Sequence, residues 1–189
     1  GVFNDTDYIL FYAKGPDTWS LDETTGLFNH FKHQYVDTSY YFIGINTGDL
    51  PARVQQVSSL GSSPDYIANT FNDFVFHEID RENMLKSGRE WYGEKFDVQT
   101  TYNFSGEKYT FPNIDPEAET VVRANLISRS TVAGSSKFIL DVNGKKAERS
   151  FSSVGTGITS IFATTNDIEV KLTHASPGLN INITYQKNA

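Results

Sequence analysis

The stretch "SKFILDVNGKKAERSF" (residues 136–151) decides the fold that this sequence predicts. It places Asn143-Gly144 between two strand-like runs, and this dipeptide is the strongest short-range signal for a two-residue hairpin turn. Side chains in a strand point alternately to the two faces of a sheet, so each run can bury one face and expose the other. The stretch therefore predicts an antiparallel β-hairpin.

Further strand-like segments lie on both sides of this hairpin. In "IEVKLTHA" (168–175) Ile168, Val170 and Leu172 face one way and the polar residues between them the other, and in "TVVRANLISRS" (120–130) apolar residues alternate with polar ones, with Ser128 expected on the polar face. The remaining segments of this kind are "VQTTYNF" (98–104), "TSIFATT" (159–165) and "LNINITYQ" (179–186). Short strands at intervals of roughly 8–12 residues are the signature of a β-sandwich.

The predicted fold class is therefore all-β, with two domains. Residues 1–96 form a small N-terminal β unit with long loops and a linker segment, and residues 97–189 form an antiparallel, jelly-roll-like sandwich. In the first domain, "DYILFYA" (7–13), "YYFIGIN" (40–46) and "ARVQQVSSL" (52–60) are expected to be strands.

Composition and charge exclude several classes of protein. The net charge of −7 and the lack of a basic stripe argue against a nucleic-acid partner, because such partners are bound by lysine and arginine. No apolar run is long enough for a membrane-spanning helix. The chain has no cysteine, so it has neither a disulfide nor a thiol nucleophile.

The stretch "LKSGREWYGEKFDV" (85–98) concentrates charged and aromatic residues, and it follows a short helix or turn expected at Asp80–Lys86. We interpret it as the joint between the two domains, with aromatic side chains filling the small cores and Arg89 paired with a carboxylate. The alternative is a contact surface in which Trp91 anchors a partner. The joint residues are Arg89, Glu90, Trp91, Tyr92, Glu94 and Phe96.

Other side chains are weaker candidates for ligand binding. His30 and His33 are three residues apart but lack an acidic third zinc ligand, and His77 and His174 are isolated in the sequence. Carboxylates and carbonyls of Ile114–Glu119 are the candidate ligands for calcium, and no other cofactor is expected. Aromatic residues that could stack on a sugar ring, or simply pack inside the protein, are Trp19, Tyr40, Tyr41 and Tyr109.

Three segments occur in an order that resembles a known family. They are "DYILFYAKGPDTW" (7–19), "HQYVDTSYYFI" (33–43) and "FHEIDRENMLKSGREWYGEKF" (76–96). Together they resemble the region ahead of the catalytic domain in gingipain-like C25 cysteine peptidases, most closely the type IX secretion system signal peptidase, or sortase, of Bacteroidetes. In this family a catalytic domain with a His–Cys dyad follows. Since this chain has no cysteine, the resemblance implies a non-catalytic region upstream of the peptidase domain.

The resemblance also implies a setting for the chain. We expect a secreted, cell-surface or outer-membrane-associated protein whose partners are the catalytic domain of the same polypeptide and outer-membrane or secretion-system proteins. A carbohydrate-binding β-sandwich module is the alternative function, and a self-contained hydrolase is the least favoured. The segment "NINITYQKNA" (180–189) is expected to leave an unpaired sheet edge, which favours a homodimer through that edge.

Overall fold

The computed structural model describes residues 8–44, 48, 55–59, 61 and 63–187. The chain divides into two compact units, one that ends at Phe74 and one that begins at Val75. Within the described residues, the regular elements are eight strands and one short 3₁₀-helix, so the predicted all-β fold class is confirmed. The predicted domain boundary, between residues 96 and 97, lies inside the second of these units and stays a prediction.

The first unit contains one hairpin, formed by β1 (Thr18–Asp22) and β2 (Leu27–Phe31). Its turn is held by the Asp22 carboxylate, which accepts hydrogen bonds from the Thr24 backbone N–H at 2.9 Å and from the Thr25 hydroxyl at 2.8 Å. These bonds lower the pKa of Asp22. The turn ends at Gly26, whose φ of +69° is a conformation that glycine adopts without strain.

Three segments predicted as strands do not form strands where the structure describes them. Residues 8–13, 40–44 and 55–59 have no regular structure, and their large side chains are exposed. Tyr8 is 81% exposed and Phe42 is 97% exposed. High β-propensity did not suffice here, because a strand also needs a neighbouring backbone to pair with. The rest of the last two predicted strands, residues 45–46, 52–54 and 60, lies outside the described residues.

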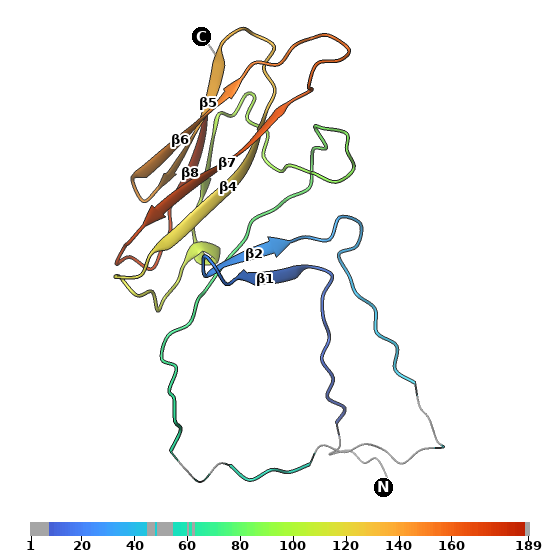
Figure 1. Cartoon of the computed structure of the whole chain (residues 1–189), viewed down its shortest axis with the longest axis vertical. Helices are drawn as coiled ribbons and strands as arrows, with labels where there is room; N and C mark the ends of the chain where they lie inside the picture. Colours follow the sequence, from blue (N-terminus) through green and yellow to red (C-terminus); the bar gives the residue numbers. More distant parts are fainter. Residues whose placement is uncertain (1–7, 45–47, 49–54, 60, 62, 188–189) are drawn as a thin grey trace. The chain divides into compact units, whose positions relative to one another are not determined.

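The second unit is a β-sandwich (Figure 1). One sheet has four strands in the order β3-β8-β5-β6, and the other pairs β4 with β7; every pairing is antiparallel. The 3₁₀-helix η1 (Glu107–Tyr109) follows β3. The strands are β3 (Thr101–Phe104), β4 (Thr120–Ser128), β5 (Ser135–Val142), β6 (Lys145–Ser152), β7 (Thr164–Leu172) and β8 (Ile181–Gln186).

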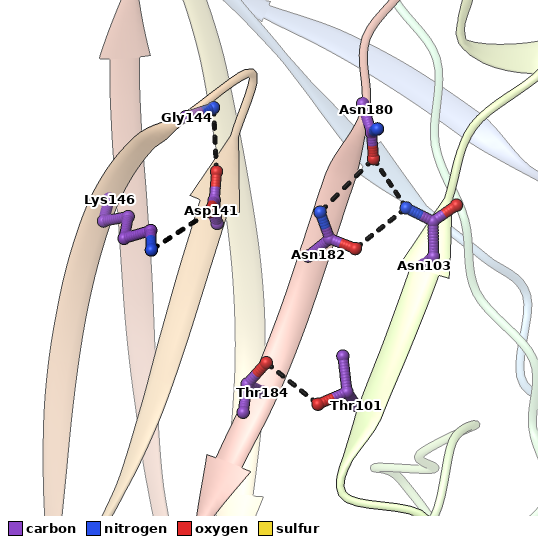
Figure 2. A network of polar contacts seen from close by, with 8 residues as sticks. All are labelled: Thr101, Asn103, Asp141, Gly144, Lys146, Asn180, Asn182 and Thr184. Atoms are coloured by element: carbon purple, nitrogen blue, oxygen red, sulfur yellow. Dashed lines mark hydrogen bonds and ion pairs between the residues drawn. The ribbon is translucent and has the colours of Figure 1, made fainter.

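The hairpin predicted from residues 136–151 is present as β5 and β6. Val142 lies opposite Lys145, so the connecting turn has two residues, Asn143 and Gly144. Both have positive φ, +49° and +89°, as a type I′ turn requires. The Asp141 carboxylate accepts a hydrogen bond from the Gly144 N–H at 2.8 Å, which fixes the turn from one side (Figure 2).

The core lies between the inner faces of the two sheets and follows the predicted alternation. On β7 the apolar side chains at every second position, from Ile168 to Leu172, are buried. Ser128 is a correction, because it is only 5% exposed. Its position has the same parity as Leu126, so the strand's period of two turns it inward, where its hydroxyl meets that of Ser136 at 3.1 Å.

The strand predicted at the end of the sequence is present as β8, but it is not an edge strand. It pairs with β3 on one side and with β5 on the other. The prediction of an unpaired edge at residues 180–189 is therefore wrong for its described part. Sequence pattern alone cannot place a strand within the order of a sheet, because neighbours in a sheet need not be neighbours in the chain. Within the described residues, no helix is long and apolar enough to span a membrane.

Candidate interaction surfaces

The segment that carries the most specific sequence motif, residues 77–96, forms an arm of the second unit. The arm folds back on itself: the Glu82 N–H donates to the Tyr92 carbonyl and the Tyr92 N–H to the Glu82 carbonyl, each at 2.9 Å. Of the short helix or turn expected at Asp80–Lys86, the turn is present: the Lys86 N–H donates to the Asn83 carbonyl at 3.1 Å. Lys86 and Gly88 have positive φ values, +52° and +72°, and turn the chain where a helix would have continued.

Two contacts hold the two sides of the arm together. His77, which looked isolated in the sequence, has its Nε2 2.8 Å from an Oε1 of Glu94. Gly93 lies so close to the opposite side that a Cβ there would be 2.9 Å from the backbone oxygen of Ile79. The glycine in the motif is thus required by a close backbone approach.

The arm is tied to the sandwich by aromatic rings. The centroid of the Phe96 ring lies 5.2 Å from that of Phe138, which is in the core, and 4.8 Å from that of Tyr102. Burial raises the pKa of Tyr92 to about 12, and the nearby carboxylates of Glu90 and Asp167 add to the shift. The side of the arm that carries Tyr92 and Phe96 is therefore part of the second unit.

The six residues predicted as a domain joint differ in their exposure. Arg89, Glu90 and Trp91 are exposed, with 40% of Trp91 accessible, so this indole is not enclosed in a core. Tyr92, Glu94 and Phe96 are half-buried. All six belong to the second unit. The joint stays a prediction, and the exposed tip with Trp91 also fits the alternative of a contact surface.

The structure does not bring the four predicted sugar-stacking residues together. Tyr109 is 8% exposed and belongs to the core of the second unit, so its ring has no free face. Trp19 is half-buried in the first unit, with its ring centroid 4.1 Å from that of Phe74. Tyr41 bonds to the Lys14 carbonyl through its hydroxyl, while Tyr40 is 79% exposed.

Metal ligands do not gather in the part of the chain that the structure describes: no three His, Asp or Glu side chains are grouped to hold an ion. His33 uses its Nδ1 to accept hydrogen bonds from the Tyr35 and Val36 N–H groups. In the segment considered for calcium, Asp115 caps a local turn by accepting from the Glu117 N–H at 2.9 Å. Calcium binding stays a prediction without a carboxylate cluster to support it.

A polar surface that the sequence did not reveal covers the outer face of the four-stranded sheet (Figure 2). The Asn103 amide nitrogen donates to the side-chain oxygens of Asn180, at 2.5 Å, and of Asn182, at 2.8 Å. Beside them the hydroxyls of Thr101 and Thr184 lie 3.0 Å apart. The sequence indicates part of this surface by asparagines at alternate positions of "LNINIT". Asn103, which lies next to them, belongs to a strand that is far away in the sequence.

Comparisons with known proteins identify a structural neighbour. No family model matches the chain, and a search of the curated proteins found no match. The fold is similar to part of a solved structure, the crystal structure of dimeric latent PorU from Porphyromonas gingivalis, with a TM-score of 0.67 at 18% sequence identity. The likeness covers 94% of this chain and 17% of that chain. At this identity it shows the fold alone.

Proposed function

We propose that this chain is a non-catalytic accessory region of a gingipain-like C25 peptidase that acts in type IX protein secretion. Its role is to brace or present a catalytic domain in the same polypeptide. The observation that carries the proposal is the likeness of nearly the whole chain to a small part of PorU, 94% against 17%. The segments that resemble the C25 family in sequence, residues 7–19, 33–43 and 76–96, support it.

The lack of a cysteine supports a place for the chain in the non-catalytic part. A C25-type peptidase attacks its substrate with a cysteine thiolate, and this sequence has no cysteine. Peptide-bond hydrolysis by that route is therefore excluded for the chain itself. The motif residues instead build the arm, in which Gly93 and the His77–Glu94 pair fix the shape and Trp91 is presented at the exposed tip.

The test begins with the gene that encodes this chain. We expect it to encode a C25-like domain with a histidine and a cysteine, and we expect the purified chain alone to show no peptidase turnover. The separately produced catalytic domain should bind the chain in a calorimetric titration. Trp91→Ala should weaken that binding at least tenfold, whereas Ile158→Ala, at a fully exposed site of the same unit, should not. A gene without such a domain would refute the proposal.

The alternative function is a carbohydrate-binding module, favoured by the amide and hydroxyl groups on the outer sheet face. Asparagine amides can donate to and accept from sugar hydroxyls at once. Along the paired strands β3 and β8 this face carries Thr101, Asn103, Asn182 and Thr184, none of which can stack on a sugar ring, so the affinity would depend on hydrogen bonds. A glycan array, repeated with Asn103→Ala, tests this alternative: binding abolished by the substitution would support it over the accessory role.

A further inference from the structure

Two loops at one end of the sandwich lie side by side. The first, residues 129–134, joins β4 to β5, and the second, residues 153–163, joins β6 to β7 (Figure 1). The Val154 N–H donates to the Ser130 carbonyl at 2.8 Å, and the Arg129 Nη1 donates to the Phe162 carbonyl at 3.1 Å. These bonds join the two loops into one surface, the loop end.

The loop end presents apolar side chains to water. The Ser160 N–H donates to the Gly157 carbonyl at 3.0 Å and closes a β-turn that has Ile158 at its tip. Ile158 is fully exposed, so its side chain contributes little to the stability of the unit. The large apolar side chains exposed at the loop end are those of Val132, Ile158, Ile161 and Phe162.

The loop end also lacks the negative charge that dominates the rest of the chain. Residues 120–140 and 149–166, which include both loops, contain no Asp or Glu, although the chain has 23 of them and a net charge of −7. The Arg129 guanidinium lies 3.8 Å from the centre of the Phe162 ring, and the described residues contain no ion pair of Arg129. Asp97, before β3, is balanced by Lys187, whose Nζ lies 3.6 Å from its carboxylate.

We propose that the loop end binds the surface of an anionic phospholipid bilayer, with Ile158 and Ile161 inserted at the headgroup–acyl boundary and Arg129 at the phosphates. Binding to such a surface grows with the apolar area inserted and with the attraction of cations to anionic lipids. An arginine can lay its stem along apolar surface while its guanidinium bonds to phosphate oxygens in pairs.

The shape of the loop end favours a bilayer over a protein partner. A bilayer yields around a protruding turn tip, whereas a protein partner needs a well-packed pocket for each apolar anchor. The serine and threonine hydroxyls between the apolar residues, such as those of Thr156 and Thr159, can donate to headgroup oxygens. The membrane contact is independent of the accessory role, because it uses the loops of the sandwich and not the arm.

Sedimentation of the full chain with phosphatidylcholine vesicles, with and without phosphatidylglycerol, tests the lipid contact. The chain should sediment with vesicles that contain phosphatidylglycerol, less with pure phosphatidylcholine, and less again at high salt. Ile158→Asp should weaken the binding about tenfold or more, because it removes an inserted apolar side chain and adds a carboxylate. The matched control, Ile67→Asp at an exposed site of the first unit, should bind like the unmodified chain.

Circular dichroism checks that both variants fold as the unmodified chain does. If the chain does not sediment with the anionic vesicles, or if Ile158→Asp and Ile67→Asp lose binding equally, the proposal is overturned.

A fluorescent label tests which end of the sandwich enters the bilayer. Because the chain has no cysteine, Ile158→Cys carries a label at one site only. A label whose emission shifts to shorter wavelength in apolar surroundings should shift there when anionic vesicles are added. Ala175→Cys, in the exposed loop after β7 at the other end of the sandwich, is the control and should show no shift.

Equal shifts at the two labelled sites would contradict the proposal, because the loop end would then not be the part that inserts. A shift at Ile158→Cys with the separately produced catalytic domain, and none with vesicles, would also overturn it and assign the loop end to a protein partner.

Discussion

The two units of the chain respond differently to similar sequence content. Both contain runs of aromatic and β-branched residues, yet the second unit turns more of them into strands; an exception is residues 159–163 of the predicted strand "TSIFATT", which precede β7. In the first unit Phe42 is 97% exposed, and in the second Phe151 is 1% exposed. The difference shows that β-propensity sets which residues suit a strand, while pairing and a second apolar layer decide whether the strand forms.

The second unit has local sequence signals that bring pairing strands and a second apolar layer together. Its β5–β6 hairpin closes through a two-residue turn, and its strands alternate buried and exposed side chains that match across two sheets. The first unit has one short hairpin, β1 and β2, whose turn has four residues, and between its other apolar runs the sequence gives no tight turn of the Asn-Gly type.

The largest effect is expected from removing one phenylalanine ring in each unit. Phe151→Ala should destabilise the second unit by about 3–5 kcal/mol, because it leaves a cavity in a packed core. Phe42→Ala should change the free energy of unfolding by less than about 0.5 kcal/mol, because its ring is exposed. Urea denaturation of the two variants measures both effects. Equal losses of stability would remove the distinction drawn between the units.

The second expected effect concerns the buried hydroxyl pair of the sandwich. Ser128→Ala should cost about 1–3 kcal/mol, because it leaves the Ser136 hydroxyl buried without its partner. The double substitution with Ser136→Ala should cost less than the sum of the two single ones. A thermodynamic cycle from urea denaturation provides the test. Strict additivity would show that the two hydroxyls do not depend on each other.

A smaller effect is expected from a substitution in the two-residue turn of the β5–β6 hairpin in the second unit. Gly144 has a φ of +89°, so Gly144→Ala should destabilise the unit by about 1 kcal/mol or slightly more, through backbone strain. Gly15 in the first unit is the matched site, because a methyl group added there would meet open space and its φ is not positive, so Gly15→Ala should be nearly neutral. Thermal unfolding of both variants distinguishes them. If Gly144→Ala did not change the stability of the second unit, the turn would not be what makes its hairpin form.

The smallest effect is a pH dependence confined to the first unit. Burial lowers the pKa of His30 from 6.5, so the folded hairpin favours the neutral ring. The unfolded state then binds more protons between the lowered pKa and 6.5, and the hairpin loses stability as the pH falls through that window. Trp19, whose ring lies 4.6 Å from His30, reports this by fluorescence in a Trp91→Phe background. His30→Gln should remove the pH dependence; if it persists, another group causes it.

The contrast between the units also separates what the sequence could predict from what it could not. The Asn143-Gly144 hairpin and the buried face of β7 were predictable, because both depend on residues close together in the chain. The position of β8 between β3 and β5 was not, since strand order depends on pairings between distant segments. Ser128 was assigned to the wrong face although its parity was visible, because its polarity was given more weight than its position.

At the candidate surfaces, too, the sequence predicted local features and missed those that depend on contacts between distant residues. Sequence identified residues 85–98 as unusual, but the arm's geometry depends on contacts across it, such as His77 with Glu94. The asparagine cluster needed the pairing of β3 with β8, which joins residues 83 apart in sequence. Tyr109 was considered for ligand stacking because it is aromatic, and its place in the core came from the sandwich as a whole.

The place of β8 inside its sheet has a consequence for how the protein is made. Until the ribosome has synthesised β8, β3 and β5 lack the neighbour that joins them, so the four-stranded sheet cannot close before then. Non-local pairing of this kind slows folding, because the entropy of closing a long loop is lost before the contacts form. The four-stranded sheet of the nascent chain therefore stays open until β8 has been made, and partly folded chains with unpaired strands are prone to aggregate.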